Sequence, residues 1–268
     1  PILFDANGIS VPTSWDELNA AAEKLQAAGV IPFAHGGQAW QDATVFEAVA
    51  MGIGGNNYYK NCYVDLKETC LRSETTVKVF DQMRKLQGFT DEGSPGRDWN
   101  VATGMVIEGK AGFQIMGDWA KGEFTAAGKV PGVDYYCAPT PSNNGYLYNV
   151  DSFIFYKTSD PEKQEGQKLL AKLMMGKNFQ KVFNIYKGSI PARLDVSMDE
   201  FDKCAKTSNS DIKTAGASGG LVPSFAHGMA QGNTMKAALQ DVITEHFNSD
   251  MSSVDAANAL ADSVLDNM

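Results

Sequence analysis

The chain has 268 residues, of which 43 % are hydrophobic and 21 % are charged, a composition that supports folded cores and argues against a disordered protein. Its 32 acidic side chains outnumber 23 basic ones, for a net charge of −9, and no long Lys/Arg run occurs, which argues against binding to nucleic acid or an anionic membrane face. No apolar stretch reaches the roughly 18 residues that a membrane span needs, and the length allows one large domain or two small ones.

The first predicted element is a helix over residues 11–29. Thr13 and Ser14 are candidate N-caps, and Glu17 follows Ser14 at the spacing of a capping box. Apolar side chains then recur at helical spacing until Gly29, which ends the helix.

The rest of the chain alternates between predicted strands and helices. Up to residue 160 the pattern predicts a short strand that runs into a glycine loop (30–37), a helix stopped by its glycines (42–55), a helix (76–89), strands at 111–117 and 148–160, and between them a strand that runs into a proline-rich turn (133–141). Asp160 then caps the first of two helices, which are separated near Gly176. Residues 198–268 are mostly helical, with interruptions at 208–211 and 216–228. Alternation of this kind indicates an α/β protein, with Pro139–Gly145 as the best candidate for a passage between two lobes.

Four cysteines stand at positions 62, 70, 137 and 204, with no CxxC pair, so a structural zinc site is not expected. Cys62 and Cys70 span a short loop that a disulfide closes easily, and Cys137 and Cys204 would then pair across a long one. Three connectivities remain open, as do four reduced, buried thiols. The even number favours disulfides and an oxidising compartment.

Signatures of catalysis are mostly absent from the sequence. GxSxG, HExxH, the P-loop and GxGxxG between a strand and a helix do not occur, and the three histidines lie far apart. A pair of carboxylates for glycoside hydrolysis remains open, because their separation depends on the fold. Asp118, beside Trp119, is the acid in the most suggestive setting. No cofactor or metal is predicted.

Four motifs, in order along the chain, carry a resemblance to a known family. They are VPTSWDEL (11–18), GKAGFQIMGDW (109–119), GSIPARLDV (188–196) and PSFAHG (223–228). Together they resemble periplasmic solute-binding proteins that deliver sugars to ABC transporters, most closely the bacterial glucose/mannose type. The resemblance implies a periplasmic protein that is a monomer when complete, binds a monosaccharide, glucose first, and passes it to membrane permease subunits.

The resemblance also implies a type II periplasmic-binding-protein fold, in which two α/β lobes close over a sugar. Residues 1–148 would form mainly the C-terminal lobe, 149–192 a segment of the N-terminal lobe, and 193–268 a return to the C-terminal lobe. Family members carry an N-terminal portion before the helix that begins at VPTSWDEL, so the resemblance implies that this sequence, which starts at Pro1, is without that portion.

A sugar site needs an aromatic plate for the C–H face of the ring and polar side chains for its hydroxyl groups. Trp119 follows a predicted strand and matches the cleft tryptophan of the family, whereas most tryptophans belong to the core. Trp40 follows a strand and a Gly-Gly turn, a common place for cleft residues, with packing as the equal alternative.

The predicted polar contacts come from three other segments. Asn149 and Asp151 would share one face of a strand, or else form a solvated turn. Lys187 ends a helix, where a cation also complements the helix dipole, and His227 lies in a turn-rich loop like the one that supplies a sugar-contacting histidine in the glucose-type proteins. His35 and His246 are expected to be structural.

Two other functions stay open on sequence grounds. One is a glycan-processing enzyme that uses Asp118 or Asp151 as acid or base. The other is a partial lobe that folds without an intact site, which predicts an unstable or oligomeric product because an apolar interface would be exposed.

Overall fold

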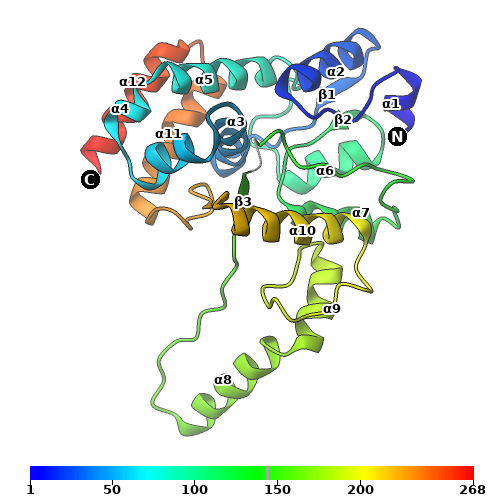
Figure 1. The fold of residues 1–268 in the computed structure, drawn as a ribbon, viewed down its shortest axis with the longest axis vertical. Helices are drawn as coiled ribbons and strands as arrows, with labels where there is room; N and C mark the ends of the chain where they lie inside the picture. Colours follow the sequence, from blue (N-terminus) through cyan, green and yellow to red (C-terminus); the bar gives the residue numbers. More distant parts are fainter. Residues whose placement is uncertain (143–144) are drawn as a thin grey trace.

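The computed structural model describes residues 1–142 and 145–268 and shows a helix-rich α/β chain (Figure 1). Its helices are α1 (Ile2–Ala6), α2 (Trp15–Ala27), α3 (Ala39–Tyr59), η1 (Lys60–Val64), α4 (Glu68–Leu71), α5 (Glu74–Gln87), α6 (Trp99–Ile107), η2 (Asp118–Ala120), α7 (Lys121–Ala126), α8 (Pro161–Met174), α9 (Lys177–Lys187), α10 (Lys203–Ser218), α11 (Asn233–Asn248) and α12 (Ser253–Asp266). Its strands are β1 (Ile31–Phe33), β2 (Ala111–Phe113), β3 (Tyr146–Tyr148) and β4 (Leu221–Pro223).

The strands form two small parallel sheets. β1 pairs with β2, with Ile31 opposite Ala111, and β3 pairs with β4, with Tyr146 opposite Leu221. Each pair joins segments about 75 to 80 residues apart, far more than the roughly dozen residues that a parallel crossover needs. The segment after β2 and the loop after β4, which follow strands of different sheets, meet where the rings of Trp119 and His227 are in contact.

The main core lies between helices α3, α5, α11 and α12, which pack against one another. Aromatic side chains fill its centre: Phe46 of α3 contacts Tyr63, Phe80 and Phe225, with ring centroids 5.0–6.3 Å apart. All four rings are fully buried. This core supports β4 and the loop that follows it, because Phe225 belongs to that loop.

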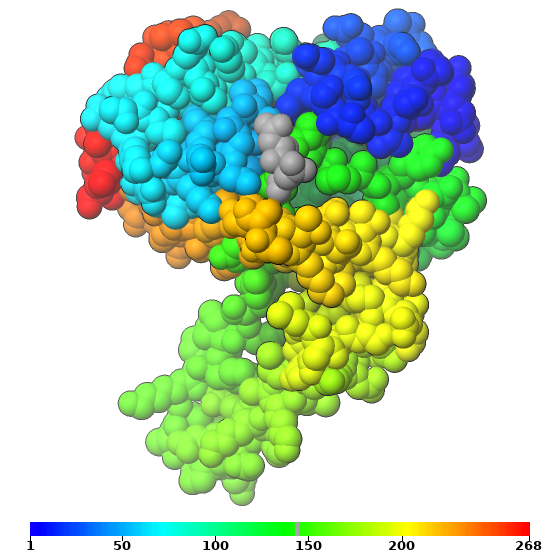
Figure 2. All heavy atoms as spheres, viewed as in Figure 1, coloured from blue at the N-terminus to red at the C-terminus, as the bar shows by residue number. Residues whose placement is uncertain are grey.

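Residues 149–192 project from this body as an extended segment, α8 and α9 (Figures 1 and 2). α8 buries no side chain, and α9 buries only Asn184. The projecting part is anchored where α9 packs on α7, and where Val196, Phe201 and Ala205 form a small separate core.

Several predicted helix boundaries are confirmed. The Ser14 side chain accepts a hydrogen bond from the Glu17 N–H, as the predicted capping box requires. The Glu17 carboxylate reaches back one residue further than in a standard capping box, and accepts from the N–H and hydroxyl of Thr13 instead of the N–H of Ser14. Asp160 caps α8 with Pro161 at its first position. α8 and α9 separate at residues 175–176, next to the predicted break at Gly176.

The helix expected over 42–55 begins at Ala39, and its predicted end at the glycines is confirmed: Gly55 has φ +73° and ψ −178°, outside the helical range, and a second helical segment follows up to Tyr59. One helix prediction is wrong. The interruption expected at 208–211 lies inside α10, where its polar side chains lie on a surface helix. The break over 216–228 is present and contains β4.

Three strand predictions differ from the structure, one in extent and two in the conformation of the segment. Residues 111–117 contain only the three-residue β2, and residues 133–141 contain no strand. The segment 148–160 leaves β3 at Tyr148 and has no regular structure up to residue 158. Its apolar run faces solvent, with Ile154 77 % and Tyr156 80 % exposed, because no described strand pairs with it. Residues 143–144 of the predicted crossing Pro139–Gly145 lie outside the described residues.

The cysteines pair as the favoured reading predicted, Cys62 with Cys70 and Cys137 with Cys204. The first disulfide joins η1 to α4, and the second ties the segment before β3 to α10. Within the described residues, no helix is long and apolar enough to cross a membrane.

Candidate functional site

Three of the predicted residues form an aromatic cluster. The His227 ring lies edge-on to Trp119, with centroids 5.1 Å apart, and edge-on to Trp40, at 6.0 Å. Trp40 lies in the first turn of α3, Trp119 in η2, and His227 in the loop after β4. All three side chains are half-buried. They therefore present apolar ring faces at a surface instead of filling a closed core.

The position of the Trp119 ring depends on Gly117. A Cβ built on Gly117 would lie 2.1–2.4 Å from atoms of the Trp119 six-membered ring, so the indole lies directly over the backbone of Gly117. The φ of Gly117 is −64°, which any residue can adopt. The glycine is required for space and not for backbone conformation.

We expect Gly117→Ala to displace the Trp119 ring while the fold persists, because the new methyl group overlaps the ring and the backbone is unstrained. Sugar affinity should fall about tenfold, about 1.4 kcal/mol, and the tryptophan fluorescence should shift. Gly216→Ala is the matched control, since a Cβ there meets nothing within 4 Å. Unchanged affinity in Gly117→Ala would show that the ring position does not matter.

The predicted polar residues meet beside this cluster. The Lys187 ammonium forms a short ion pair with Asp151, and the Asn149 amide donates to the other Asp151 oxygen at 3.4 Å. The hydrogen bond from Lys187 holds the pKa of Asp151 below its usual value, and His227 lies close enough to act on Asp151 in the same direction. Asp151 is exposed and Lys187 half-buried, so both can reach a ligand.

The end of α9 places Lys187. Gly188 follows it in the left-handed conformation, φ +91°, and a Cβ on Gly188 would lie 2.7 Å from the Gly122 nitrogen and 2.9 Å from the Asp118 carbonyl oxygen. The C-terminus of α9 therefore packs directly on η2 and α7. That contact brings Lys187 to the segment that carries Trp119.

The hydrogen bonds around His227 define its tautomer. The Thr44 hydroxyl donates to the Trp40 carbonyl at 2.8 Å, so its oxygen accepts from the His227 Nε2–H at 3.1 Å. Nδ1 then carries a lone pair. Burial lowers the pKa of His227 to about 4, and a neutral ring at pH 7 can accept a hydrogen bond at Nδ1.

Asp118, the residue before Trp119, lies in a more buried setting than Asp151. Asp118 accepts a hydrogen bond from the Ser189 hydroxyl at 2.8 Å, and burial raises the pKa of its carboxyl group. Sequence reasoning singled out Asp118 but missed Ser189 and Thr44, because their partners lie 71 and 183 residues away along the chain.

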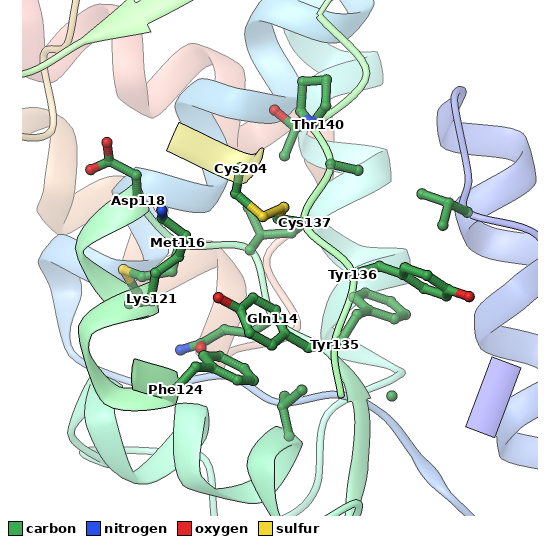
Figure 3. Close-up of a pocket in the computed structure, with 18 of the residues that line it drawn as sticks. Gln114, Met116, Asp118, Lys121, Phe124, Tyr135, Tyr136, Cys137, Thr140 and Cys204 are labelled. Carbon is green, nitrogen blue, oxygen red and sulfur yellow. A yellow bond between two sulfur atoms is a disulfide. The ribbon is translucent and has the colours of Figure 1, made fainter. Parts of the chain in front are cut away.

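A cavity of about 700 Å³ is lined in part by Asp118 (Figure 3). Its walls include the segment after β2, residues 134–141 and α10, with Phe124 and Tyr135 stacked at 4.2 Å and the Cys137–Cys204 disulfide in one wall. None of the six predicted site residues lines it. The sequence carries no signal for this cavity, because its walls come from segments far apart along the chain and residues 133–141 are expected to form a strand and a proline-rich turn.

The two other histidines lie in the core. His35 bonds to Asp42 at 2.7 Å and stacks on Phe33, and His246, whose pKa is lowered to about 4 by burial, packs on Phe80. Both are 1 % exposed, which fits the structural role expected for them. Among the described residues, no group of three or more His, Cys, Asp or Glu side chains is arranged to hold a metal ion.

Several relatives are similar to this chain along nearly its whole length. One from Brucella suis biovar 1, named "Probable sugar-binding periplasmic protein", is 46 % identical over 97 % of this chain and 62 % of its own length. Another of that name from Rhizobium meliloti is 43 % identical over 97 % of this chain and 63 % of its own length. The chain therefore spans about three fifths of these curated relatives.

Solved structures give the fold. A chitin oligosaccharide binding protein superimposes with a TM-score of 0.75 over 99 % of this chain and 67 % of its own, at 16 % identity. This likeness confirms the predicted α/β fold of the two-lobe periplasmic binding proteins. A family model described as bacterial extracellular solute-binding protein matches residues 1–174, and the chain belongs to this family.

Proposed function

We propose that the chain binds a monosaccharide, with glucose as the first candidate, between its main body and the projecting segment 149–192. The observation that carries the proposal is the cluster of Trp119, Trp40 and His227 beside the Asp151–Lys187 ion pair. Half-buried ring faces next to charged hydrogen-bonding groups match a pyranose, which has apolar C–H faces and a rim of hydroxyl groups.

Each polar group has a distinct task in this proposal. Asp151 accepts hydrogen bonds from sugar hydroxyls, Lys187 donates to their lone pairs, and Nδ1 of His227 accepts. Asn149 orients the Asp151 carboxylate. A sugar with an inverted or missing hydroxyl would leave one of these groups without a partner, which is how such a site selects among sugars.

The proposed mechanism of binding is closure of two lobes. Trp40 and His227 belong to the main body, whereas Asp151 and Lys187 belong to the projecting segment, so a ligand that touches both stabilises the closed arrangement. The proposal keeps the division expected from the sequence: a C-terminal lobe over 1–148 and 193–268, and a part of the N-terminal lobe over 149–192.

The proposed role is delivery of the bound sugar to the permease of an ABC importer, as a periplasmic protein that acts as a monomer. Membership of a solute-binding family and the printed names of the relatives support this role, and two disulfides fit an oxidising compartment. The family also argues against the enzymatic alternative with Asp118 or Asp151. That alternative predicts release of product from chromogenic glycosides, and we expect none.

The decisive test is calorimetric titration of D-glucose into the protein, with D-galactose and maltose alongside. We expect saturable heat with glucose and much weaker heat with the other two. Heat with galactose or maltose alone would overturn the choice of glucose but keep a sugar site. Silence from all three would overturn the proposal for this chain and favour a lobe that folds without an intact site.

A further inference from the structure

A glutamate in the core lies directly behind the aromatic cluster. Glu47 of α3 is 3 % exposed, and several hydrogen-bond donors converge on its carboxylate. The Ser224 hydroxyl lies 2.7 and 2.9 Å from the two oxygens, the Tyr59 hydroxyl donates at 3.0 Å, and the Ala226 N–H donates at 3.2 Å. Two of these donors belong to the loop that ends in His227.

The carboxylate reaches His227 through one intermediate side chain. The Ser224 hydroxyl oxygen, held by Glu47, accepts a hydrogen bond from the His227 N–H at 3.0 Å. Tyr59 adds a second attachment, because its hydroxyl accepts from the Phe225 N–H at 3.1 Å and lies 3.0 Å from Glu47. Each of the four residues from Ser224 to His227 is therefore bound, directly or through one step, to Glu47.

A carboxyl group in this position is costly, since no cation is recorded with it among the described residues and burial raises its pKa to about 7. Packing alone would favour an apolar side chain of the same size. The loop, in turn, has backbone N–H groups at Phe225, Ala226 and His227 that β4 does not satisfy. Glu47 satisfies these N–H groups, either by accepting a hydrogen bond directly or by holding the Ser224 and Tyr59 hydroxyls that accept one.

We propose that Glu47 is a positioning residue for the sugar site: from the core it holds the loop Ser224–His227 so that the His227 ring stays against Trp119 and Trp40. The inference rests on the proposed function for its effect on sugar binding. Its effect on the ring of His227 does not require a sugar.

Three variants test the role. Glu47→Met keeps the approximate volume but removes both acceptor oxygens, and it should weaken glucose binding at least tenfold. Glu47→Gln keeps an acceptor for Tyr59 and Ala226, and its amide N–H can donate to the Ser224 oxygen in place of the hydrogen bond that Ser224 donates to the carboxylate, so it should bind within about threefold of the parent. Ser224→Ala, which removes only the intermediate hydroxyl, should weaken binding about fivefold and covers the case in which Glu47→Met does not fold.

Asp42→Asn is the matched control. Asp42 is a second fully buried acid of α3, but it bonds to His35 and Thr244 and not to the loop. We expect this variant to lose thermal stability and keep its affinity for glucose.

Ring NMR signals of the three histidines give the readout that is independent of sugar. Glu47→Met and Ser224→Ala should move the His227 signals and leave those of His35 in place, while Asp42→Asn should do the reverse. Unmoved His227 signals in both loop variants would overturn the positioning role even if the parent binds glucose. If the His227 signals move in the two loop variants but the parent protein binds no sugar, the positioning role of Glu47 is supported and only the proposed function is contradicted.

Discussion

Replacing Trp119 by alanine is expected to weaken glucose binding by about 30-fold, because an aromatic side chain at the centre of a binding site is typically worth about 2 kcal/mol. The indole is half-buried, so part of it is open to a sugar, and it also supports the His227 ring at 5.1 Å. Calorimetry with D-glucose measures the loss, and the cooperative thermal unfolding of the variant checks that it stays folded.

Tyr136→Ala distinguishes the aromatic cluster from the large cavity. Tyr136 is a partly exposed aromatic residue that lines the cavity and contacts Phe4 (Figure 3). Its removal should leave glucose affinity unchanged. If Tyr136→Ala weakens binding and Trp119→Ala does not, the sugar occupies the cavity and the proposed site is wrong.

The low pKa of His227 adds a check by pH. Since burial lowers this pKa to about 4, the ring stays neutral as the pH falls from 8 to 6, and Asp151 stays ionised because its pKa is also lowered. Affinity for glucose should therefore be constant over this range. A decrease of affinity at pH 6 would mean that His227 becomes protonated there and cannot accept at Nδ1.

The helices could be predicted from local chemistry more fully than the strands, of which β1 falls inside the segment expected over 30–37 and β2 inside that over 111–117. Ser14 and Asp160 cap their helices through neighbours two or three residues away, so the signal lies in the sequence itself. A strand needs a partner, and the apolar run that predicted one over 148–160 only indicates that these side chains favour burial. In the structure Ile154 and Tyr156 have no described partner and face solvent.

The candidate site shows the same division. Trp40, Trp119 and His227 were chosen separately, from strand ends and from the family resemblance, and the structure brings them together from three distant segments. The residue that holds the His227 loop in place, Glu47, could not be predicted from the sequence. Glu47 occurs in the middle of an apolar helical run, and only the tertiary structure shows that a loop 177 residues later needs its oxygens.

The disulfides lead to the second large expected effect. Closing a loop restricts the unfolded chain more when the loop is longer, and for sequence separations of 67 and 8 the chain-entropy relation gives about 4.4 and about 2.5 kcal/mol. Replacing Cys137 and Cys204 together by serine should therefore lower the free energy of unfolding more than replacing Cys62 and Cys70. Urea unfolding of the two double variants, each compared with the parent, measures the difference.

The longer loop should also matter for the site. Cys204 lies in the first turn of α10, next to the cap Asp202, which binds the Lys121 ammonium at 2.7 Å. Lys121 begins α7, directly after the η2 turn that carries Trp119. Without the Cys137–Cys204 bond, this end of α10 loses one of its attachments, so glucose affinity should fall along with stability. In the Cys62 and Cys70 variant, whose disulfide joins η1 to α4 away from these contacts, stability should fall and affinity should persist. Equal losses of affinity in both double variants would contradict this link between α10 and the aromatic cluster.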